Sequence, residues 1–347
     1  MRSDAGATPL RSSMTWGEFE VVCPRCHGPL APEGSSVTCG SCQAAFAIDL
    51  GLLDLRVFPD PYISIEDDRA KGRRIFSKFP EFDFAGLVRY YYSITPAVRP
   101  EQARMFTAGV LAAGARARAI LDAWHKQAGA PAGGSLLEIG CGTAPMLLAA
   151  RERYDRLIGI DISFRWLTVG RKRMQEAGSE LPIICGCAEA LPFPSGSFDH
   201  VAMESTLEVT RDQAATLREC IRVLRPGGAL LLTTQNRFSI GPDPHTGLWG
   251  GSMLPESLVL GYVRRRGGIP PRRRFLSAGS LARSVAAAGF HNVRVSASEI
   301  TTEQSGVIPA PLRIGISAYR AARSIPGAGS ILRLIGPSLL ATARKPV

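Results

Sequence analysis

Two acidic residues and two glycines stand where a short apolar run gives way to a helix-like segment. Glu138 lies near the end of the run, and Gly140 and Gly142 follow it. Glycines at such a turn let the backbone approach a ligand, because no side chain intervenes. Pro145 suits the first turn of the next helix, whose free N–H groups favour a carboxylate. Asp161 ends the next apolar run, where one carboxylate can accept both hydroxyls of a ribose.

Two classes of ligand use a glycine loop of this kind. A dinucleotide fingerprint needs the spacing Gly-x-Gly-x-x-Gly, and its third glycine would fall on position 145, which is proline here. An acid at the end of each of the first two strands, Glu138 and Asp161, suits the methyl donor S-adenosylmethionine instead. The alternative is two incidental surface acids on an ordinary α/β fold.

Four short motifs follow one another between residues 137 and 228. They read LEIGCGT at 137–143, GIDIS at 159–163, AEALPFPSGSFD at 188–199 and RVLRPGG at 222–228. In this order they resemble the class I S-adenosylmethionine-dependent methyltransferases, in the subgroup similar to ubiquinone- and menaquinone-pathway enzymes. Residues 278–297 and 338–345 extend the resemblance more weakly.

The resemblance implies which residues hold the cofactor. Asp161 would bind the ribose, Ile162 would pack on the adenine, and the backbone of Ala188 would read the adenine edge. Glu204 would lie near the methionine part. The full set of expected cofactor residues is Glu138, Gly140, Cys141, Gly142, Asp161, Ile162, Ala188, Glu189 and Glu204.

Three positions depart from the pattern that the resemblance implies. Ala144 stands at the third glycine of the family, and Cys187 replaces the usual aspartate before Ala188, which removes one acceptor for the adenine amino group. Val209 replaces the histidine of a Leu-Glu-His motif that many relatives carry. That histidine is therefore not available as a base.

Two Cys-x-x-Cys pairs, Cys23 with Cys26 and Cys39 with Cys42, are separated by twelve residues. Four thiolates at this spacing predict a closed, tetrahedral structural zinc site. The alternative, two redox dithiols, lacks a thioredoxin-like context, and His27 is expected to be a bystander. A zinc ribbon ahead of such a domain resembles two groups of proteins: ribosomal RNA guanine-N1 methyltransferases, and bacterial methyltransferases whose ribbon is a docking or folding unit.

Polar and aromatic side chains after the fifth expected strand are candidates for acceptor binding. The loop 236–250 holds Asn236, Arg237, His245 and Trp249, where a lid without a binding role is the alternative. His245 is the candidate general base, because an oxygen acceptor gains from a base that titrates near neutrality. Tyr91 is expected either to close over the cofactor or to pack on the core.

The net charge of +11 invites a search for anionic partners. Arginine clusters at 264–266 and 272–274 could contact nucleic acid, although solvated surface is the preferred interpretation. The basic, amphipathic segment 311–340 could lie on a membrane surface, while packing on the sheet is preferred.

No run of about 18 apolar residues predicts a spanning helix. With no apolar run between Arg2 and Arg11, we expect a cytoplasmic protein, with peripheral contact to the inner face of the membrane as an option.

The elements that must carry these residues follow an alternation of short apolar runs and helix-like segments. Strands are expected near 135–140, 156–161, 182–187, 198–203 and 228–234, and one helix from Pro100 to about Lys126. This pattern predicts an α/β, Rossmann-like fold with a seven-stranded, mostly parallel sheet and helices on both faces, plus a small N-terminal zinc ribbon. The expected units are a disordered leader at 1–17, the ribbon at 18–58, a helical cap at 59–134, and a methyltransferase domain at 135–347 with insertions at 235–277 and 303–335.

Three functional hypotheses follow from these residues. The preferred one is a methyltransferase that uses S-adenosylmethionine and structural Zn²⁺ and acts on oxygen or carbon of a small-molecule, lipid-linked or glycan-linked acceptor. The second is a ribosomal or transfer RNA base methyltransferase that grips phosphates with the ribbon and the arginine clusters. The third is a non-catalytic protein that binds the cofactor and an interaction partner, suggested by Cys187 and Val209.

Overall fold

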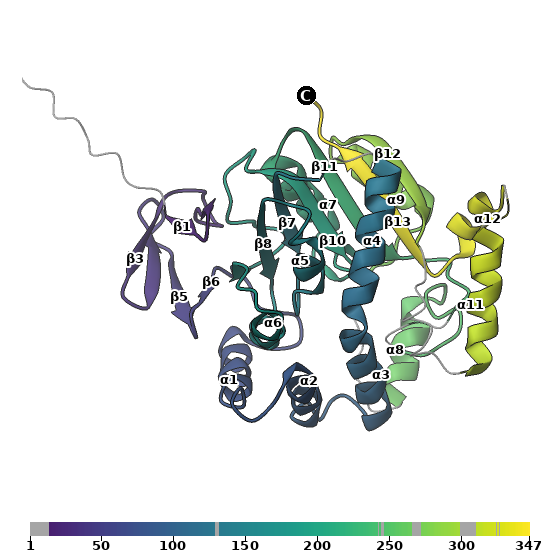
Figure 1. Cartoon of the computed structure of the whole chain (residues 1–347), viewed down its shortest axis with the longest axis horizontal. Helices are drawn as coiled ribbons and strands as arrows, with labels where there is room; N and C mark the ends of the chain where they lie inside the picture. Colours follow the sequence, from purple (N-terminus) through teal and green to yellow (C-terminus); the bar gives the residue numbers. More distant parts are fainter. Residues whose placement is uncertain are drawn as a thin grey trace, which may run out of the picture.

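The computed structural model describes residues 14–128, 132–241, 243, 246–265, 272–298, 310–323, 325 and 327–347. An eleven-stranded sheet runs through this part of the chain, in the order β12-β13-β11-β10-β7-β8-β9-β6-β5-β4-β3. Helices cover both of its faces (Figure 1). The predicted α/β class is therefore confirmed, with more strands than expected.

Seven strands form the predicted Rossmann-like unit. They are β7 (Ser135–Ile139), β8 (Arg156–Asp161), β9 (Ile183–Cys185), β10 (Phe198–Glu204), β11 (Leu224–Gln235), β12 (His291–Ala297) and β13 (Ser338–Arg344). The five strands from β7 to β11 are parallel, whereas β13 is antiparallel to both β11 and β12. Because parallel neighbours end at the same edge, Glu138 and Asp161 come to one side of the sheet.

Four more strands extend the sheet beyond β9, which corrects the expected count of seven. They are β3 (Leu30–Glu33), β4 (Ser36–Cys39), β5 (Ala45–Asp49) and β6 (Leu52–Asp54). β6 pairs in parallel with β9, and β3, β4 and β5 follow in antiparallel order. The edge of β9 would otherwise leave backbone N–H and C=O groups unpaired. The cysteine-bearing segment is thus continuous with the central sheet.

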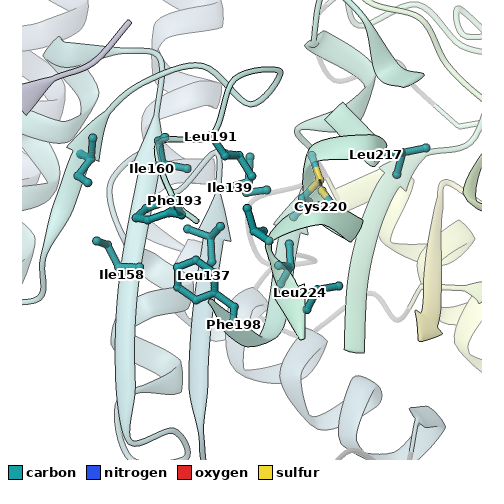
Figure 2. Packing of buried hydrophobic residues seen from close by; sticks show 14 of the residues in the cluster. Leu137, Ile139, Ile158, Ile160, Leu191, Phe193, Phe198, Leu217, Cys220 and Leu224 are labelled. Atoms are coloured by element: carbon teal, nitrogen blue, oxygen red, sulfur yellow. Dashed lines mark hydrogen bonds between the residues drawn. The ribbon is translucent and has the colours of Figure 1, made fainter. Parts of the chain in front are cut away.

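The buried side chains alternate between two faces with the period of two that a strand imposes. On one face, a single hydrophobic cluster includes Leu137 together with Leu217 and Cys220 of α7 (Gln213–Val223) (Figure 2). The same cluster extends to residues of α9 (Ala278–Ala287) and to Val37 and Phe46 of the added strands. On the other face, Leu136 packs against α4 (Ala113–Ala128), α5 (Pro145–Ala150) and α6 (Phe164–Glu176). The cysteine-bearing strands therefore share a hydrophobic core with the central sheet.

Four helices of the described chain lie between β6 and β7 in the sequence. They are α1 (Ile65–Phe76), α2 (Phe84–Ser93), α3 (Pro100–Leu111) and α4. The Ser64 hydroxyl accepts from the Asp67 N–H to begin α1, and the Asp83 carboxylate caps α2 in the same way. The single helix expected from residue 100 to about 126 is interrupted at Ala112.

The two expected insertions carry helices of their own. These are α8 (Glu256–Arg265), α11 (Ala310–Arg323) and α12 (Ala328–Ile335), which lie together at one side of the molecule (Figure 1). Short elements complete the described chain: β1 (Thr15–Trp16), β2 (Phe19–Glu20) and a 3₁₀ turn at Leu207–Val209. Among the described helices, none is both long enough and apolar enough to cross a membrane.

Candidate active site

The loop between β7 and α5 has the backbone shape that its glycines predict. Gly140, Gly142 and Ala144 all have positive φ, at 77°, 48° and 60°. A Cβ atom at Gly140 would overlap the Thr206 side chain, so this position requires glycine. Ala144 adopts the left-handed conformation with a side chain present, which costs about 1–2 kcal/mol relative to glycine.

Glu138 lies beneath this loop and supports it. Its Oε2 accepts a hydrogen bond of 3.0 Å from the backbone N–H of Leu147, in the first turn of α5. Only 1% of Glu138 is exposed, and it does not line the cleft described below. Burial raises the pKa of this carboxyl well above its usual range, and the nearby charge of Glu204 adds to the rise. Glu138 therefore orders the helix that follows the loop.

Asp161, at the end of β8, bonds to the backbone of the glycine loop and also lines the cleft described below. Its Oδ2 accepts from the N–H of Gly142 at 2.9 Å, and its Oδ1 accepts from the N–H of Ser163 at 2.7 Å. Burial raises its pKa to about 6, although these two backbone hydrogen bonds act in the opposite direction. Each carboxylate oxygen has a second lone pair that can accept from a ligand hydroxyl.

A cleft of about 710 Å³ opens above the carboxyl ends of β7, β8, β9 and β10. This volume lies within the range of small-molecule sites. Of the residues that the sequence predicts for the cofactor or the acceptor, those that line the cleft are Gly140, Asp161, Ile162, Ala188, Glu189, Glu204 and Tyr91. The Glu204 carboxylate pairs with Arg116 of α4, and Glu189 accepts from the N–H of Arg211 at 2.7 Å.

Other predicted residues lie elsewhere. Cys141 is buried behind the loop. Gly142 does not line the cleft, but its N–H group donates to Asp161, which does. Asn236 is fully buried, and its amide donates to carbonyl oxygens at the end of α12, including that of Leu334 at 2.9 Å. Its amide therefore fixes the chain after β11 and does not face the cleft. Arg237 and Trp249 are exposed outside the cleft.

His245, the candidate base, lies outside the described residues. Of the departures from the family pattern, Cys187 is buried with its thiol 3.6 Å from the carbonyl oxygen of Phe58. Val209 lines the cleft.

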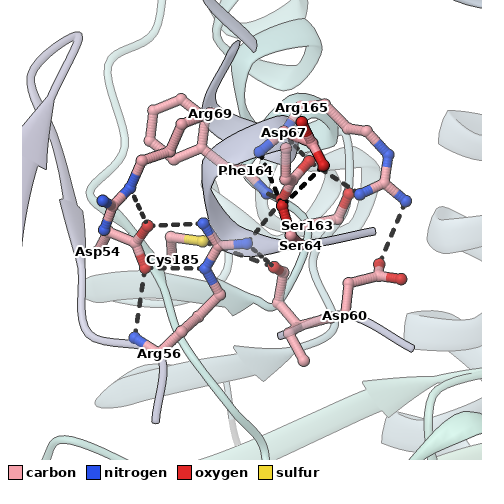
Figure 3. Close-up of polar contacts among 12 residues, drawn as sticks. Asp54, Arg56, Asp60, Ser64, Asp67, Arg69, Ser163, Phe164, Arg165 and Cys185 are labelled. Carbon is pink, nitrogen blue, oxygen red and sulfur yellow. Dashed lines mark hydrogen bonds and ion pairs between the residues drawn. The ribbon is translucent and has the colours of Figure 1, made fainter. Parts of the chain in front are cut away.

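A buried ionic cluster lies beside Ser163 and Phe164, where α6 begins (Figure 3). Arg56 donates to both carboxylate oxygens of Asp54, at 2.8 and 2.6 Å, and to Asp68 at 2.6 Å. Its Nη1 also donates to the carbonyl oxygen of Ile162 at 3.1 Å. Burial opposes ionisation of Asp54, but the hydrogen bonds and charge of Arg56 outweigh it and lower the pKa of Asp54. Arg56 thus connects the chain that follows β6 to the backbone next to Asp161.

Asp68 of α1 connects this cluster to the first residues of α6. Its carboxylate accepts from the N–H of Phe164 at 2.8 Å and from the side chain of Arg165 at 2.8 Å. Arg165 also pairs with Asp60 at 3.2 Å and lines the cleft. Sequence reasoning missed this cluster. The available signal was the run LLDLRVF at 52–58, in which charged residues interrupt an otherwise apolar strand pattern.

Besides Arg165, the wall of the cleft includes four basic side chains. These are Lys71, Arg99, Arg211 and Arg272. The Lys71 ammonium bonds to the Thr95 hydroxyl at 2.5 Å and lies 4.2 Å from the centre of the Tyr91 ring. Burial, together with the charge of Arg165, lowers the pKa of Lys71 to about 8. This wall can hold a negatively charged group opposite the carboxylates.

The arginine clusters do not form one solvent-facing stripe within the described residues. Arg273 pairs with buried Asp243, while Arg272 lines the cleft and its N–H donates to the Tyr62 hydroxyl at 2.7 Å. Arg264 and Arg265 end α8 and are exposed. Two members of the cluster at 272–274, Arg272 and Arg273, therefore make contacts within the protein.

The four N-terminal cysteines converge at the ends of two matching turns. Their sulfur atoms all lie within 4.8 Å of one another, with Cys23 and Cys42 at 3.6 Å and Cys26 and Cys39 at 3.5 Å. In each turn the residue after the second cysteine, His27 or Gln43, has a positive φ and donates its N–H to the carbonyl oxygen of the first cysteine. The four thiols therefore form one compact group that could hold a metal ion.

Comparisons with known proteins find similarities in the part of the chain that carries the glycine loop and Asp161. Residues 137–232 match a family described as "Methyltransferase domain". The chain is 28% identical over 165 residues to the ubiquinone biosynthesis O-methyltransferase of Idiomarina loihiensis, covering 47% of this chain and 64% of that protein. It is 37% identical over 115 residues to the ubiquinone/menaquinone biosynthesis C-methyltransferase of Hahella chejuensis, covering 30% and 45%.

Among solved structures, the phosphoethanolamine N-methyltransferase 2 of Haemonchus contortus, in complex with S-adenosyl-L-methionine, overlaps with a TM-score of 0.44. It is 18% identical and covers 66% of this chain and 52% of that one. The chain spans less than two thirds of the length of the two curated relatives above. The family match begins in β7 and ends in β11, around the loop, Asp161 and Glu204. This part of the chain is therefore similar to a methyltransferase domain.

Proposed function

We propose that this protein transfers a methyl group from S-adenosylmethionine to oxygen or carbon of a small-molecule or lipid-linked acceptor. The observation that carries this proposal is a single cleft in which Gly140, Asp161, Ala188 and Glu204 face one space. The cleft lies at the carboxyl ends of parallel strands, where open α/β sheets bind their ligands.

The residues of the cleft fit the cofactor. Asp161 offers two acceptor oxygens to the ribose hydroxyls, and Ile162 with Ala188 offers an apolar slot for the adenine. The glycine at position 140 leaves room for the methionine part beside Glu204. When bound, S-adenosylmethionine supplies a methyl group on a positively charged sulfur. The protein must then align the acceptor and exclude water, which contributes more than acid–base chemistry does.

The acceptor would occupy the outer half of the cleft, between α2, α3 and α8. Apolar residues such as Val98, Phe106 and Val263 line the cleft together with the cations Lys71 and Arg99. Such a lining suits an aromatic or conjugated ring that carries an anionic oxygen. Relatives named as ubiquinone and menaquinone biosynthesis methyltransferases support a quinone-type acceptor.

The test is to supply the protein with a cofactor labelled in its methyl group and with fractionated RNA, lipid and small-metabolite pools from cells. We expect label in the lipid or small-metabolite pool. At a limiting cofactor concentration, Asp161→Asn should lower labelling at least about tenfold, whereas Asp122→Asn, at an exposed carboxylate on α4, should not. Label in RNA alone would contradict the acceptor class. Cofactor binding without transfer to any pool would contradict the enzymatic role.

We also propose that Cys23, Cys26, Cys39 and Cys42 hold one structural zinc ion. Zn–S bonds of about 2.3 Å in a tetrahedron place the sulfur atoms about 3.8 Å apart. Two of the observed separations, 3.6 and 3.5 Å, are close to this value. Elemental analysis should find one zinc per chain, and Cys39→Ser should lower that content. The buried Cys220→Ser, outside the cluster, should leave the zinc content unchanged.

A further inference from the structure

Within the part of the chain that the structure describes, most large hydrophobic side chains that remain exposed come from the two insertions. They are Phe238, Ile240, Trp249, Met253, Leu254, Leu258, Ile325, Ile331 and Leu334. Leu258 is 60% exposed and Ile331 is 62% exposed. Single exposed apolar residues are ordinary, but a cluster of this size marks an interaction surface. These nine residues are called the insertion surface below.

Hydrogen bonds hold the two insertions side by side. The amide of Asn236 donates to the carbonyl oxygen of Leu334 at 2.9 Å, and the N–H of Ile240 donates to that of Ile335 at 3.4 Å. The N–H of Gly250 donates to Gly241 at 3.0 Å, which folds the first insertion back on itself. In Figure 1, α8, α11 and α12 gather at the same side of the molecule.

The charge around the insertion surface is positive. Exposed arginines at 237, 264, 265 and 333 flank it. No Asp or Glu occurs between residues 310 and 335, and the first insertion contributes only Glu256 and Asp243 between 237 and 265. Asp243 is buried and pairs with Arg273, so it does not offset the exposed arginines. Apolar side chains with a basic fringe are the composition that binds an anionic lipid surface.

The same insertion also builds the cleft. α8 exposes Leu258 on one side, while its next turn supplies Tyr262 and Val263 to the cleft wall. Arg272 and Thr246 of this insertion line the cleft as well. A surface that held α8 against lipid would therefore bring the outer half of the cleft close to the lipid.

We propose that the insertion surface binds the protein to a membrane that contains anionic lipid, so that a lipid-linked acceptor reaches the cleft from the bilayer. A second copy of the chain fits less well, because a symmetric dimer would bring the same arginines from both copies together. The choice of acceptor rests on the proposed function. Membrane binding itself does not require catalysis.

The experiment is sedimentation of the full chain with vesicles of phosphatidylcholine alone and with vesicles of equal parts phosphatidylcholine and phosphatidylglycerol. We expect at least tenfold stronger binding to the anionic vesicles, weakened by added salt. The double variant Leu258→Ser, Ile331→Ser should bind them at least tenfold more weakly. Arg237→Gln with Arg333→Gln should weaken binding and reduce its salt dependence. Val347→Ser, at an exposed position near another edge of the molecule, is the matched control (Figure 1).

Calorimetric titration with S-adenosylmethionine checks that each variant is folded. It also separates the two proposals, because a wild-type protein that binds vesicles but not the cofactor would fail only the proposed function. Equal binding of the wild type and the Leu258, Ile331 double variant to anionic vesicles would overturn the membrane proposal. So would the absence of vesicle binding, or a dimer of the wild type in solution that the double variant dissolves.

Discussion

Both carboxylate oxygens of Asp161 accept hydrogen bonds from the backbone, so this one side chain orders two segments of the chain. It closes the glycine loop through Gly142 and begins the approach to α6 through Ser163. Its position was predictable, because an acid that ends a buried parallel strand must lie at the ligand edge of the sheet. Its hydrogen bonds to the loop were not predictable from spacing alone.

We expect Asp161→Asn to weaken S-adenosylmethionine binding by about 10- to 100-fold. The amide keeps one acceptor oxygen, but hydrogen bonds to a charged group are worth about 1.5–3 kcal/mol, and about 1.4 kcal/mol corresponds to tenfold. Calorimetric titration of wild type and variant gives the ratio. Equal dissociation constants would show that the ribose lies elsewhere.

The pH dependence of cofactor binding follows from the same residue. The pKa of Asp161 is raised from 3.8 to about 6, so its carboxylate takes up a proton as the pH falls through this value. In the free protein this protonation favours the folded state, because the charged form is the one that burial penalises. Ribose binding uses the charged form, so cofactor affinity should fall as the pH drops below about 6. Titrations between about pH 5 and about pH 8 measure the slope, which Asp161→Asn should flatten.

His245 stays a prediction of the sequence. If it is the base for an oxygen acceptor, His245→Ala should lower turnover at least about tenfold while cofactor binding persists. Single-turnover transfer of the labelled methyl group, compared with cofactor titration, separates the two effects. The exposed, cleft-remote His291→Ala is the control. Unchanged turnover would leave alignment by the cleft as the main source of rate.

At the scale of elements, the strands β7 to β11 agree closely with their predicted ranges. Buried parallel strands read as short apolar runs, and Gly140 follows the last residue of β7. β11 begins at Leu224, four residues before the expected start at Gly228. The predicted helix from 100 to 126 was wrong in its continuity, because the chain turns at Ala112 to reach the sheet. Local sequence patterns carry no direct signal of such tertiary constraints.

The buried ionic cluster is the clearest case of what local patterns miss. Arg56 follows β6, Asp68 lies in α1, and Arg165 lies in α6, 97 residues from Asp68, so no short motif connects all three. Their side chains are between 0% and 10% exposed, a setting in which removing one partner leaves an uncompensated buried charge. The cluster therefore fixes α1 and α6 relative to the cofactor position.

We expect Arg56→Met to lower the free energy of unfolding by about 3–5 kcal/mol. Loss of its bond to the Ile162 carbonyl should also weaken cofactor binding, because that residue borders the adenine slot. Arg73→Met removes an exposed pair with Asp49 and should cost at most about 1 kcal/mol. Denaturant unfolding and cofactor titration of both variants measure the contrast. Similar losses in the two variants would argue against a special role for the cluster.

At the scale of the whole molecule, the four-cysteine pocket and the methyltransferase sheet share one core. Cys23 and Cys39 are packed in the same hydrophobic cluster as Leu137 and Ile184. The expected ribbon at 18–58 is thus joined to the central sheet through β6. Cysteine spacing predicted the pocket, but pairing with β9 depends on contacts more than a hundred residues apart.

Removal of the proposed zinc should therefore destabilise the entire protein. A chelator is expected to lower the melting temperature in one cooperative transition, and to weaken cofactor binding through β6 and Arg56. Calorimetry with and without chelator, and with zinc added back, measures this. Two separate transitions, with the main one unchanged, would show instead that the ribbon folds independently.

The parallel pairing of β6 with β9 also bears on how the protein is made. β6 precedes β9 by roughly 130 residues, which at typical rates of synthesis is on the order of ten seconds. During that time the strands that carry the cysteines have left the ribosome, while their partner edge does not yet exist. An unpaired strand edge is prone to join other chains. A nascent ribbon with its turns already fixed by a metal would expose a shorter, stiffer edge while the ribosome completes the sheet.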